Sequence, residues 1–358
     1  MSIKSSDIGK LRLESHQLCE TTLNTAQDMV SWFGAVQGQE YAQTKWGLGL
    51  RLPHLTDNEI ENELSEGKIL RTHLLRPTWH FVSSDDIQWL LMLTAPRVNA
   101  ANTHMYRKLE LDNTVFNRCN NILTKLLKGN KQFTRAEIND EFKKNKIIAH
   151  GHRLSYIMMH SELDGIICSG ARQGNQFTYS FLADRIKTGN RFNKDEALAE
   201  LTKRYFKSRG PATIKDFSTW SGLTLTECKN GLKAVESNFE REIINENEYY
   251  FSKEISSNKK MPQDIYLLPI YDEFIMGYKD RSTILEYKNS LKNSPLFHYD
   301  CMIIFEGQII GTWKRTLAKK TIDMEYVFFR PLNKSQENAF NIAIHRYEEY
   351  LNMTLHKS

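Results

Sequence analysis

The order of predicted helices and hairpins recurs along this chain, and this recurrence restricts the possible folds more than any other feature. Each repeat contains a helix, a second helix opened by a capping signature, and a short hairpin of two strands. The repeats cover residues 21–82, 116–181 and 195–251. A recognition helix followed by a two-stranded wing is the order of a winged helix-turn-helix unit. The sequence therefore predicts about three such units in tandem.

The first repeat is the least regular of the three. A helix is predicted over residues 21–36, and a short second helix begins at Thr56 and ends at Gly67. Strands over 69–75 and 79–82 then form the hairpin. The glutamate three residues after Thr56 completes a capping box, which satisfies N–H groups that a helix start leaves without partners.

The second and third repeats follow the pattern more closely. The predicted helices cover residues 116–127, 134–143, 152–163, 195–206, 213–220 and 224–235, and the predicted strands cover 166–168, 176–181, 239–244 and 249–251. Between the first two repeats, a helix over residues 89–94 is expected to end at Pro96. Proline lacks the N–H that a helix interior needs.

The C-terminal part of the chain is predicted to be mostly strand. Apolar or alternating runs cover residues 265–269, 302–305, 308–313 and 324–329, a helix covers 335–351, and polar residues 256–260 are typical of a linker. These patterns predict an α+β fold with a C-terminal, mainly antiparallel β region. The expected domains are winged-helix units at 10–98, 99–190 and 191–258, followed by the β region with its closing helix at 259–358.

Length and composition indicate a folded protein of several domains. The chain has 358 residues, which suggests about two or three domains. Its net charge of +5 is compatible with nucleic-acid binding, but no strongly basic block is present, so phosphate binding depends on local placement of Lys and Arg. No signal-like segment or membrane-length apolar run occurs. The five scattered cysteines are typical of buried thiols in the cytoplasm.

Gln37 and Gln39 stand one residue apart, directly after an apolar run that ends at Val36. In an extended chain, residues i and i+2 lie on one face, so the two amides can converge. Each amide offers an acceptor oxygen and two donor hydrogens, and a converging pair can direct the lone pair of a water at an electrophile. This suits hydrolysis of a bond whose leaving group already carries positive charge. The alternative is that both amides are ordinary polar residues of a surface turn.

Several blocks of sequence, taken in order, resemble one known family. The blocks are residues 37–39, 75–82, 93–97, 209–213, 216–217, 220–223, 267–269, 271–274, 277–282 and 311–315. Their order and spacing are similar to those of the AlkZ-like winged-helix DNA glycosylases, which unhook interstrand crosslinks. The resemblance extends over almost the whole chain, from about Leu11 to the final helix.

The resemblance implies tandem winged helices around a C-shaped DNA-binding face. It also implies cleavage of the N-glycosidic bond of N7-alkylguanine, including guanines tethered in crosslinks. The catalytic motif of the family is a glutamine, any residue, and a second glutamine or an aspartate, which is matched by Gln37 and Gln39. Gly38 stands where a bulkier residue is expected and predicts a looser loop.

Several cationic residues are candidates for contact with the DNA backbone. They are Arg76 in the turn of the first hairpin, Arg107 in a polar and basic stretch, and Lys314, Arg315 and Lys319 on or near a predicted strand pair. The alternative for the strand pair is an ordinary solvated face. Backbone contacts of this kind position DNA without reading its sequence.

His80 is a further candidate for DNA contact, with a partly buried structural imidazole as the alternative. Trp79 is expected in the core, and Asp272 and Glu273 are expected to have structural roles. The histidines at 150, 152 and 160 have no cysteine or carboxylate at a useful spacing, so no metal site is predicted.

These observations predict a monofunctional DNA glycosylase that uses no cofactor. Its expected partner is double-stranded DNA with alkylated or crosslinked guanine, and it is expected to be a monomer, outside membranes, in the cytoplasm with the nucleoid. The alternative is a non-catalytic winged-helix DNA-binding protein or transcription regulator. A regulator usually dimerises and carries a cation-rich recognition helix, whereas the third repeat offers only Lys229 and Lys233 there.

Overall fold

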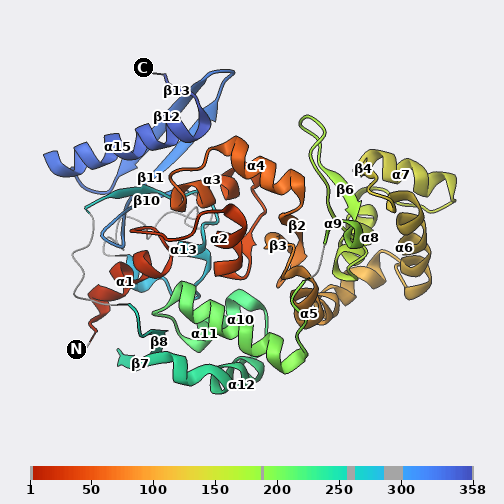
Figure 1. Cartoon of the computed structure of the whole chain (residues 1–358), viewed down its shortest axis with the longest axis horizontal. Coiled ribbons are helices and arrows are strands. Elements are labelled where there is room, and N and C mark those ends of the chain that lie inside the picture. Colours follow the sequence, from red (N-terminus) through yellow and green to blue (C-terminus); the bar gives the residue numbers. More distant parts are fainter. Residues whose placement is uncertain (1–2, 187–188, 256–262, 286–300, 357–358) are drawn as a thin grey trace.

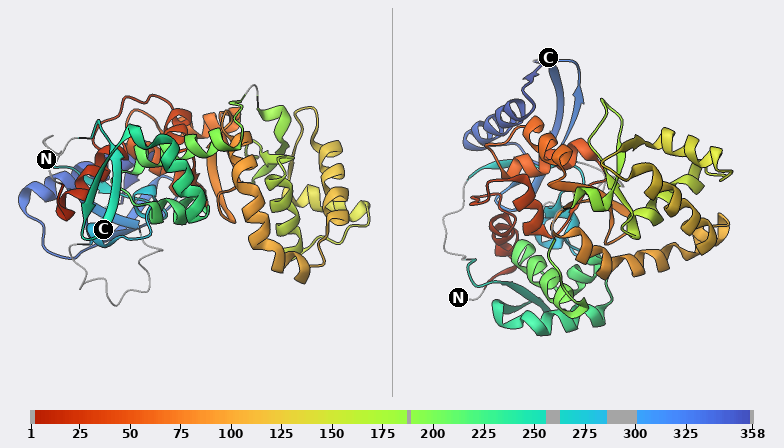
Figure 2. Two further views of the ribbon diagram at one scale, coloured as in Figure 1. Left: turned by 90° about the horizontal axis from the view of Figure 1, so that it is seen from below. Right: turned by 45° about the vertical axis from the view of Figure 1, so that its right-hand side comes forward.

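The computed structural model describes residues 3–186, 189–255, 263–285 and 301–356. These residues form an α+β fold in which helices support small, mainly antiparallel sheets. The C-terminal sheet and helix α15 (Lys334–Leu351) lie at one end of the molecule, and helices α6 (Asn113–Leu127) and α7 (Arg135–Lys144) lie at the opposite end (Figure 1). The orange part of the N-terminal third lies between these two ends, whereas the N-terminus lies at the end of the C-terminal sheet (Figure 2).

One order of elements occurs twice, with a helix, a short strand, two helices and a hairpin, and a third time without the short strand. The first copy contains α2 (Ala26–Phe33), β1 (Val36–Gln37), α3 (Tyr41–Arg51), α4 (Asp57–Glu66), β2 (Ile69–Leu74) and β3 (Thr78–Ser83). The second contains α6, β4 (Gln132–Thr134), α7, α8 (Gly151–Leu163), β5 (Ile167–Ser169) and β6 (Thr178–Phe181). The third contains α10 (Lys194–Arg209), α11 (Ile214–Ser221), α12 (Leu225–Val235), β7 (Phe239–Ile244) and β8 (Asn247–Ser252).

The small sheets of the three copies share one pairing pattern. In the first two copies the short strand pairs with the last strand, which gives the orders β1-β3-β2 and β4-β6-β5. In the third copy, a bridge between Ala212 and Tyr250 takes the place of the short strand. The sequence pattern did not predict these short strands, because two or three residues are too few to establish an alternating period.

The capping residues begin the helices where the sequence placed them. Thr56 and Thr134 each accept a hydrogen bond from the backbone N–H of the glutamate three residues later, and that glutamate completes a capping box. Thr224 does the same at α12 with Glu227, and Thr213 does so at α11 with Asp216. Gly67 ends α4 with a φ of 81°, a left-handed conformation that glycine adopts without steric cost.

Two helices differ from their expected limits. Helix α5 runs from Ile87 to Lys108 and passes through Pro96, so the expected stop there is wrong. The proline removes one helical hydrogen bond, but the helix continues because its later turns bury Val98 and Tyr106. The expected domain boundary at residues 98 and 99 therefore falls inside one continuous helix. The first helix of the first repeat is also shorter than predicted, because Thr25 caps α2 and Gly34 ends it.

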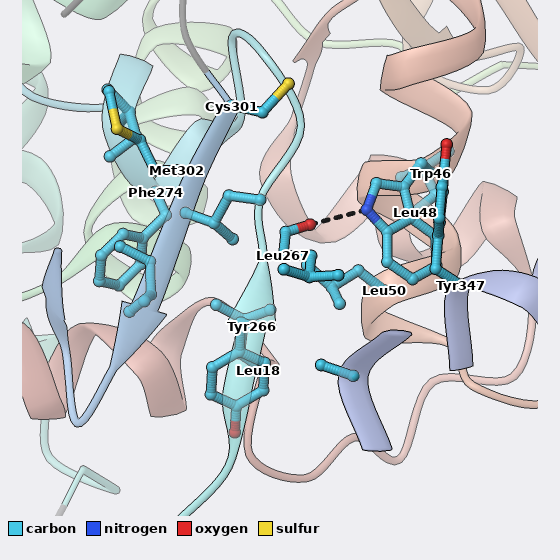
Figure 3. Packing of buried hydrophobic residues seen from close by; sticks show 14 of the residues in the cluster. Leu18, Trp46, Leu48, Leu50, Tyr266, Leu267, Phe274, Cys301, Met302 and Tyr347 are labelled. Atoms are coloured by element: carbon cyan, nitrogen blue, oxygen red, sulfur yellow. Dashed lines mark hydrogen bonds between the residues drawn. The ribbon is translucent and has the colours of Figure 1, made fainter. Parts of the chain in front are cut away.

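Helix α3 was not predicted, because Gly47 and Gly49 interrupt its pattern. Both glycines are buried and admit close neighbours: a Cβ atom on Gly49 would lie 2.3 Å from the ring of Tyr350 in α15. Trp46, which directly precedes Gly47, donates a hydrogen bond of 2.7 Å to the carbonyl of Leu267. Its ring packs on that of Tyr347, with 4.7 Å between the ring centroids (Figure 3). The helix that follows the glutamine motif is thereby fixed to the C-terminal part of the chain.

Substitution Gly49→Ala should destabilise the protein despite the higher helix propensity of alanine. Overpacking of a core typically costs about 1–3 kcal/mol, which exceeds the roughly 1 kcal/mol that alanine gains over glycine in a helix. We expect a lower midpoint of urea unfolding. The double variant Gly49→Ala with Tyr350→Leu should recover part of the loss, and a more stable single variant would contradict the packing argument.

The C-terminal sheet has the strand order β13-β12-β11-β10-β9 and confirms the expected strand-rich region. Its strands are β9 (Ile265–Leu267), β10 (Cys301–Phe305), β11 (Gln308–Leu317), β12 (Thr321–Phe328) and β13 (Thr354–Leu355), and only β13 pairs in parallel. The remaining elements are η1 (Ser5–Asp7), α1 (Ile8–Ser15), α9 (Leu182–Arg185), η2 (Glu236–Asn238), α13 (Glu273–Met276) and η3 (Ser282–Ile284). The expected linker at 256–260 lies outside the described residues. In the described part of the chain, none of the helices is long and apolar enough to cross a membrane.

Candidate active site around Gln37 and Gln39

The glutamine motif lies at the edge of the first small sheet. Gln37 is the last residue of β1 and pairs with His80 of β3. The N–H of Gly38 donates to the carbonyl of Trp79 at 2.7 Å. The backbone of the motif is therefore extended at its start, as the convergence of two amides requires.

A buried carboxylate from a distant segment fixes the backbone of Gln37. Glu273 Oε1 accepts the N–H of Gln37 at 2.9 Å. Its Oε2 accepts from two guanidinium nitrogens of Arg209 at 2.7 and 3.1 Å and from Trp220 Nε1 at 2.9 Å. Arg209 is 0% exposed and also donates to the carbonyl of Ala35. Glu273 therefore has a structural role: it links the motif to Arg209 and Trp220 of the third repeat.

The neighbouring carboxylate, Asp272, supports α3 in a similar way. Both of its oxygens accept hydrogen bonds of 2.8 Å from the guanidinium of Arg51, which lies at the end of α3. Oδ1 also accepts the N–H of Phe274 and so caps α13. With both carboxylates committed to arginines, neither extends toward solvent beside the glutamines.

The side chain of Gln37 has a fixed orientation. Arg76 Nη2 donates to its Oε1 at 3.0 Å. A guanidinium has donors only, so the atom that faces Arg76 must be the amide oxygen, and the NH₂ group of Gln37 is the end left for other partners. Burial lowers the pKa of Arg76, whose charge is shielded from water here.

Arg71 of β2 fixes the other half of the motif. Its Nε donates to the carbonyl of Gly38 at 2.9 Å, and its Nη2 lies 3.4 Å from the carbonyl of Gln39. The guanidinium stacks on the Trp79 ring at 4.1 Å. Gln39 itself is only partly buried, so its side chain remains accessible from the surface.

The expectation that Gly38 loosens the loop is wrong. A Cβ atom on this residue would lie 2.9 Å from Cδ1 of Phe81 and 3.1 Å from the backbone of β3. The absence of a side chain lets the motif pack directly on the strand. Glycine at this position allows the motif to lie close to β3, and it does not make the loop mobile.

The structure does not support a direct DNA contact by His80. The imidazole is 0% exposed, and its Nδ1 lies 2.9 Å from the carbonyl of Thr78. Burial, together with the positive charge of Arg76, holds the pKa of His80 well below its usual range. The structural alternative therefore fits His80 better.

Stability should fall as the pH drops below about 6.5, the usual pKa of histidine. His80 and His16 are both buried, and their pKa values are well below that range; burial and the charges of Arg51, Arg209 and Arg12 act on His16. The unfolded chain then binds protons that the folded chain does not, so each histidine removes up to about 1.4 kcal/mol of unfolding free energy per pH unit.

Urea unfolding at about pH 7.5, 6.5 and 5.5 tests this pH dependence. His80→Asn removes one titrating group and should reduce the slope of unfolding free energy against pH. His54→Asn changes an exposed histidine and should leave the slope as it is. An unchanged slope in His80→Asn would show that His80 is not the buried neutral group described here.

In the described part of the chain, the other candidate DNA contacts form no hydrogen bonds with the motif. Arg107 is exposed at the end of α5, Lys314 is exposed on β11, and Lys319 is exposed in the turn after it. Arg315 is partly buried and lies over the ring of Tyr347 at 5.6 Å. Among the described residues, Arg76 is the predicted DNA contact that hydrogen-bonds to a motif side chain.

Two important arginines were not among the predicted site residues. Arg71 had a usable signal, since it is a cation within an apolar predicted strand, where an unpaired charge is costly. Arg209 belongs to a block that carried the family resemblance, but its ion pair with Glu273 joins residues far apart in sequence. The described residues contain no group of three or more potential metal ligands.

Comparisons with a family model, with curated proteins and with solved structures all lead to the same family. The sequence model of the family described as DNA glycosylase AlkZ-like matches residues 30–350. A curated relative from Streptomyces sahachiroi, named interstrand DNA cross-link repair glycosylase, is 21% identical over 332 residues and 85% of each chain is covered. The solved structure of the Streptomyces sahachiroi DNA glycosylase AlkZ superposes with a TM-score of 0.81 at 16% identity, and the match covers 99% of this chain and 100% of that one. The α+β fold is therefore shared with that structure.

Proposed function

Because this chain belongs to the AlkZ-like family of DNA glycosylases, we propose that it hydrolyses the N-glycosidic bond of N7-alkylguanine, including guanines in interstrand crosslinks, with a water positioned by Gln37 and Gln39. The observation that carries this proposal is the way the motif is held. Glu273 and Arg71 bind its backbone, and Arg76 orients the amide of Gln37. Preorganised polar groups of this kind contribute strongly to catalysis, because they need no rearrangement during the reaction.

The chemistry needs neither a strong acid nor a charged base. N7-alkylguanine is a cation and becomes neutral when it leaves, so the transition state resembles an oxocarbenium ion on the sugar. The Gln39 oxygen accepts a hydrogen bond from the water, and the NH₂ group of Gln37 donates to its oxygen. The lone pair of the water is then directed at C1′. The proton is released to solvent as the C–O bond forms and the C–N bond breaks.

A lysine nucleophile is not supported near the motif. Lys45, in α3, forms ion pairs with Asp57 at 2.8 Å and with Glu61 at 2.7 Å. Its amine is buried and has both carboxylates as partners. This supports hydrolysis by water alone, which is the monofunctional reaction.

Arg76 has a second proposed role, in holding DNA. A guanidinium beside a cationic base would be unfavourable unless a negative charge lies close to it. A phosphate next to the lesion supplies that charge, and the remaining N–H groups of Arg76 can donate to it. Arg76 then links the DNA backbone to the amide of Gln37.

We further propose that the repeated order of elements is a winged helix-turn-helix in each copy, and that the copies form a C-shaped face for duplex DNA. The shared strand orders β1-β3-β2 and β4-β6-β5 support this. The proposed units are residues 10–98, 99–190 and 191–258, with α5 joining the first two, followed by the β region at 259–358. The proposed state is a monomer that acts on chromosomal DNA in the cytoplasm.

An excision assay tests the proposed activity. The purified protein is incubated with a duplex that contains one N7-methylguanine, and alkali then converts abasic sites to strand breaks. We expect breaks at the lesion and none in an undamaged duplex of the same sequence. A second arm uses a duplex crosslinked through N7 of guanine. Binding of both duplexes without any breaks would instead support a non-catalytic DNA-binding protein.

Cations on the C-terminal sheet should contribute to DNA affinity through phosphates. If Lys314 and Lys319 each bind one phosphate, substitution by alanine should lower affinity equally for all sequences. Each should also reduce the slope of log affinity against log salt by about 1. Fluorescence anisotropy across a salt series measures this, with Lys125→Ala, an exposed lysine of α6, as the matched control. Salt slopes equal to that of the wild-type protein would show that neither lysine binds a DNA phosphate.

A further inference from the structure

A hollow with a volume of about 300 Å³ opens beside the glutamine motif, between the first and second repeats. Arg71 and Trp79 line it from β2 and β3, and Arg135 lines it from the start of α7. The loop between β5 and β6 supplies a further part of the wall and includes Phe177. Pockets for small molecules have volumes from about 300 Å³ upward, so this hollow has room for about one nucleobase.

The side chains of the hollow have the chemistry that binds single bases. Phe177 is 39% exposed, and the guanidinium of Arg71 lies 4.8 Å from the centre of its ring. Aromatic faces combined with arginine are the usual platform for unpaired bases. Asn175 and Gln176 in the same loop add exposed amides, which can hydrogen-bond to base edges.

The charge of the hollow disfavours the cationic lesion as its occupant. Among the described residues that line it, two are arginines and none is acidic. Glu162 and Glu40 act electrostatically on Arg71 but do not line the hollow, and Glu162 hydrogen-bonds to His73 instead. A cationic N7-alkylguanine would be repelled here, whereas a neutral base with its anionic phosphate would be attracted.

One guanidinium connects the hollow with the motif. Arg71 lines the hollow and at the same time donates to the carbonyl of Gly38 at 2.9 Å, with the carbonyl of Gln39 at 3.4 Å. Tyr41, two residues after Gln39, contacts the Phe177 ring at 5.0 Å between centroids. A base bound on Phe177 would therefore be close to the segment that carries Gln39.

We propose that this hollow binds an unpaired nucleotide of the substrate DNA whose base is uncharged, either a neighbour of the lesion or the nucleotide opposite it, by stacking of that base on Phe177. The inference rests on the DNA-binding part of the proposed function. Displacing a neighbouring base opens the duplex at the lesion without rotating the lesion itself. A crosslinked guanine, which cannot leave the duplex freely, would then become accessible to the motif.

A fluorescent base reports such displacement. The probes are duplexes with N7-methylguanine on a 2′-fluorinated sugar, which slows hydrolysis, and with 2-aminopurine placed opposite, 5′ or 3′ to the lesion. 2-Aminopurine brightens when it leaves the base stack. We expect the wild-type protein to brighten one of the three positions, and Phe177→Ala to lose most of that signal with roughly five- to hundredfold weaker binding.

Two variants make the test specific. Phe177→Trp keeps a stacking ring and should restore both signal and affinity. Ile342→Ala removes a 67% exposed apolar side chain on α15 and should behave as wild type. Binding without brightening at any position, or full brightening with Phe177→Ala, would overturn the inference and leave the proposed glycosylase activity intact. Failure of the wild-type protein to bind any of these duplexes would instead count against the proposed function.

Discussion

Gln39→Ala should slow excision of N7-methylguanine by roughly a hundred- to a thousandfold, the usual cost of losing one preorganised polar group in an active site. Gln37→Ala should slow it by about tenfold, which corresponds to the loss of one ordinary hydrogen bond of about 1.4 kcal/mol. The difference follows from Arg76, which occupies the oxygen of Gln37 at 3.0 Å. With a cationic donor already on that oxygen, Gln37 offers mainly its donor hydrogens, so we assign to Gln39 the oxygen that orients the water.

Single-turnover rate constants measure both effects without interference from product release. Gln39→Asp keeps an acceptor oxygen and should retain activity within about tenfold of wild type, since the transition state is positively charged. Gln88→Ala, an exposed glutamine of α5, is the control for a neutral surface change. Equal losses for Gln37→Ala and Gln39→Ala would contradict the assignment of different roles.

Local signals made much of the fold predictable from sequence. Thr56 and Thr134 open helices through hydrogen bonds to residues three positions away, so the information is contained in a few neighbouring residues. The hairpins and the C-terminal strands follow from alternating patterns in the same way. Helix α3 was missed because Gly47 and Gly49 oppose helix formation locally and are explained only by neighbours from α15 and the segment near Pro269.

The candidate motif could be singled out from the sequence, but the contacts that support it could not. The position of the candidate site followed from two glutamines separated by one residue, together with sequence blocks whose order resembles that of the family. The carboxylate that holds Gln37 comes from Glu273, 236 residues later. No local pattern reports such a contact, because it depends on how the third repeat and the C-terminal segment pack against the first. The full burial of His80 was not predictable for a related reason, since burial is a property of the packed fold rather than of the neighbouring sequence.

Glu273→Gln should destabilise the protein by about 3–5 kcal/mol, the usual cost of removing one partner of a buried ion pair. Arg209 is 0% exposed and would keep its charge without the carboxylate that balances it. Chemical unfolding at neutral pH measures the loss. Asp140→Asn is the matched control, because Asp140 pairs with Lys143 at the surface with 63% exposure on each side chain, and such exposed pairs contribute little to stability.

Stability and catalysis can be separated with a second substitution. Combining Glu273→Gln with Arg209→Met removes both buried charges, and should recover a large part of the lost stability because neutral replacements of a buried pair are often tolerated. Excision should remain slow in the double variant, since Arg209 also donates to the carbonyls of Phe33 and Ala35, directly before the motif. Full recovery of excision together with stability would show that this network supports folding alone and does not position Gln37.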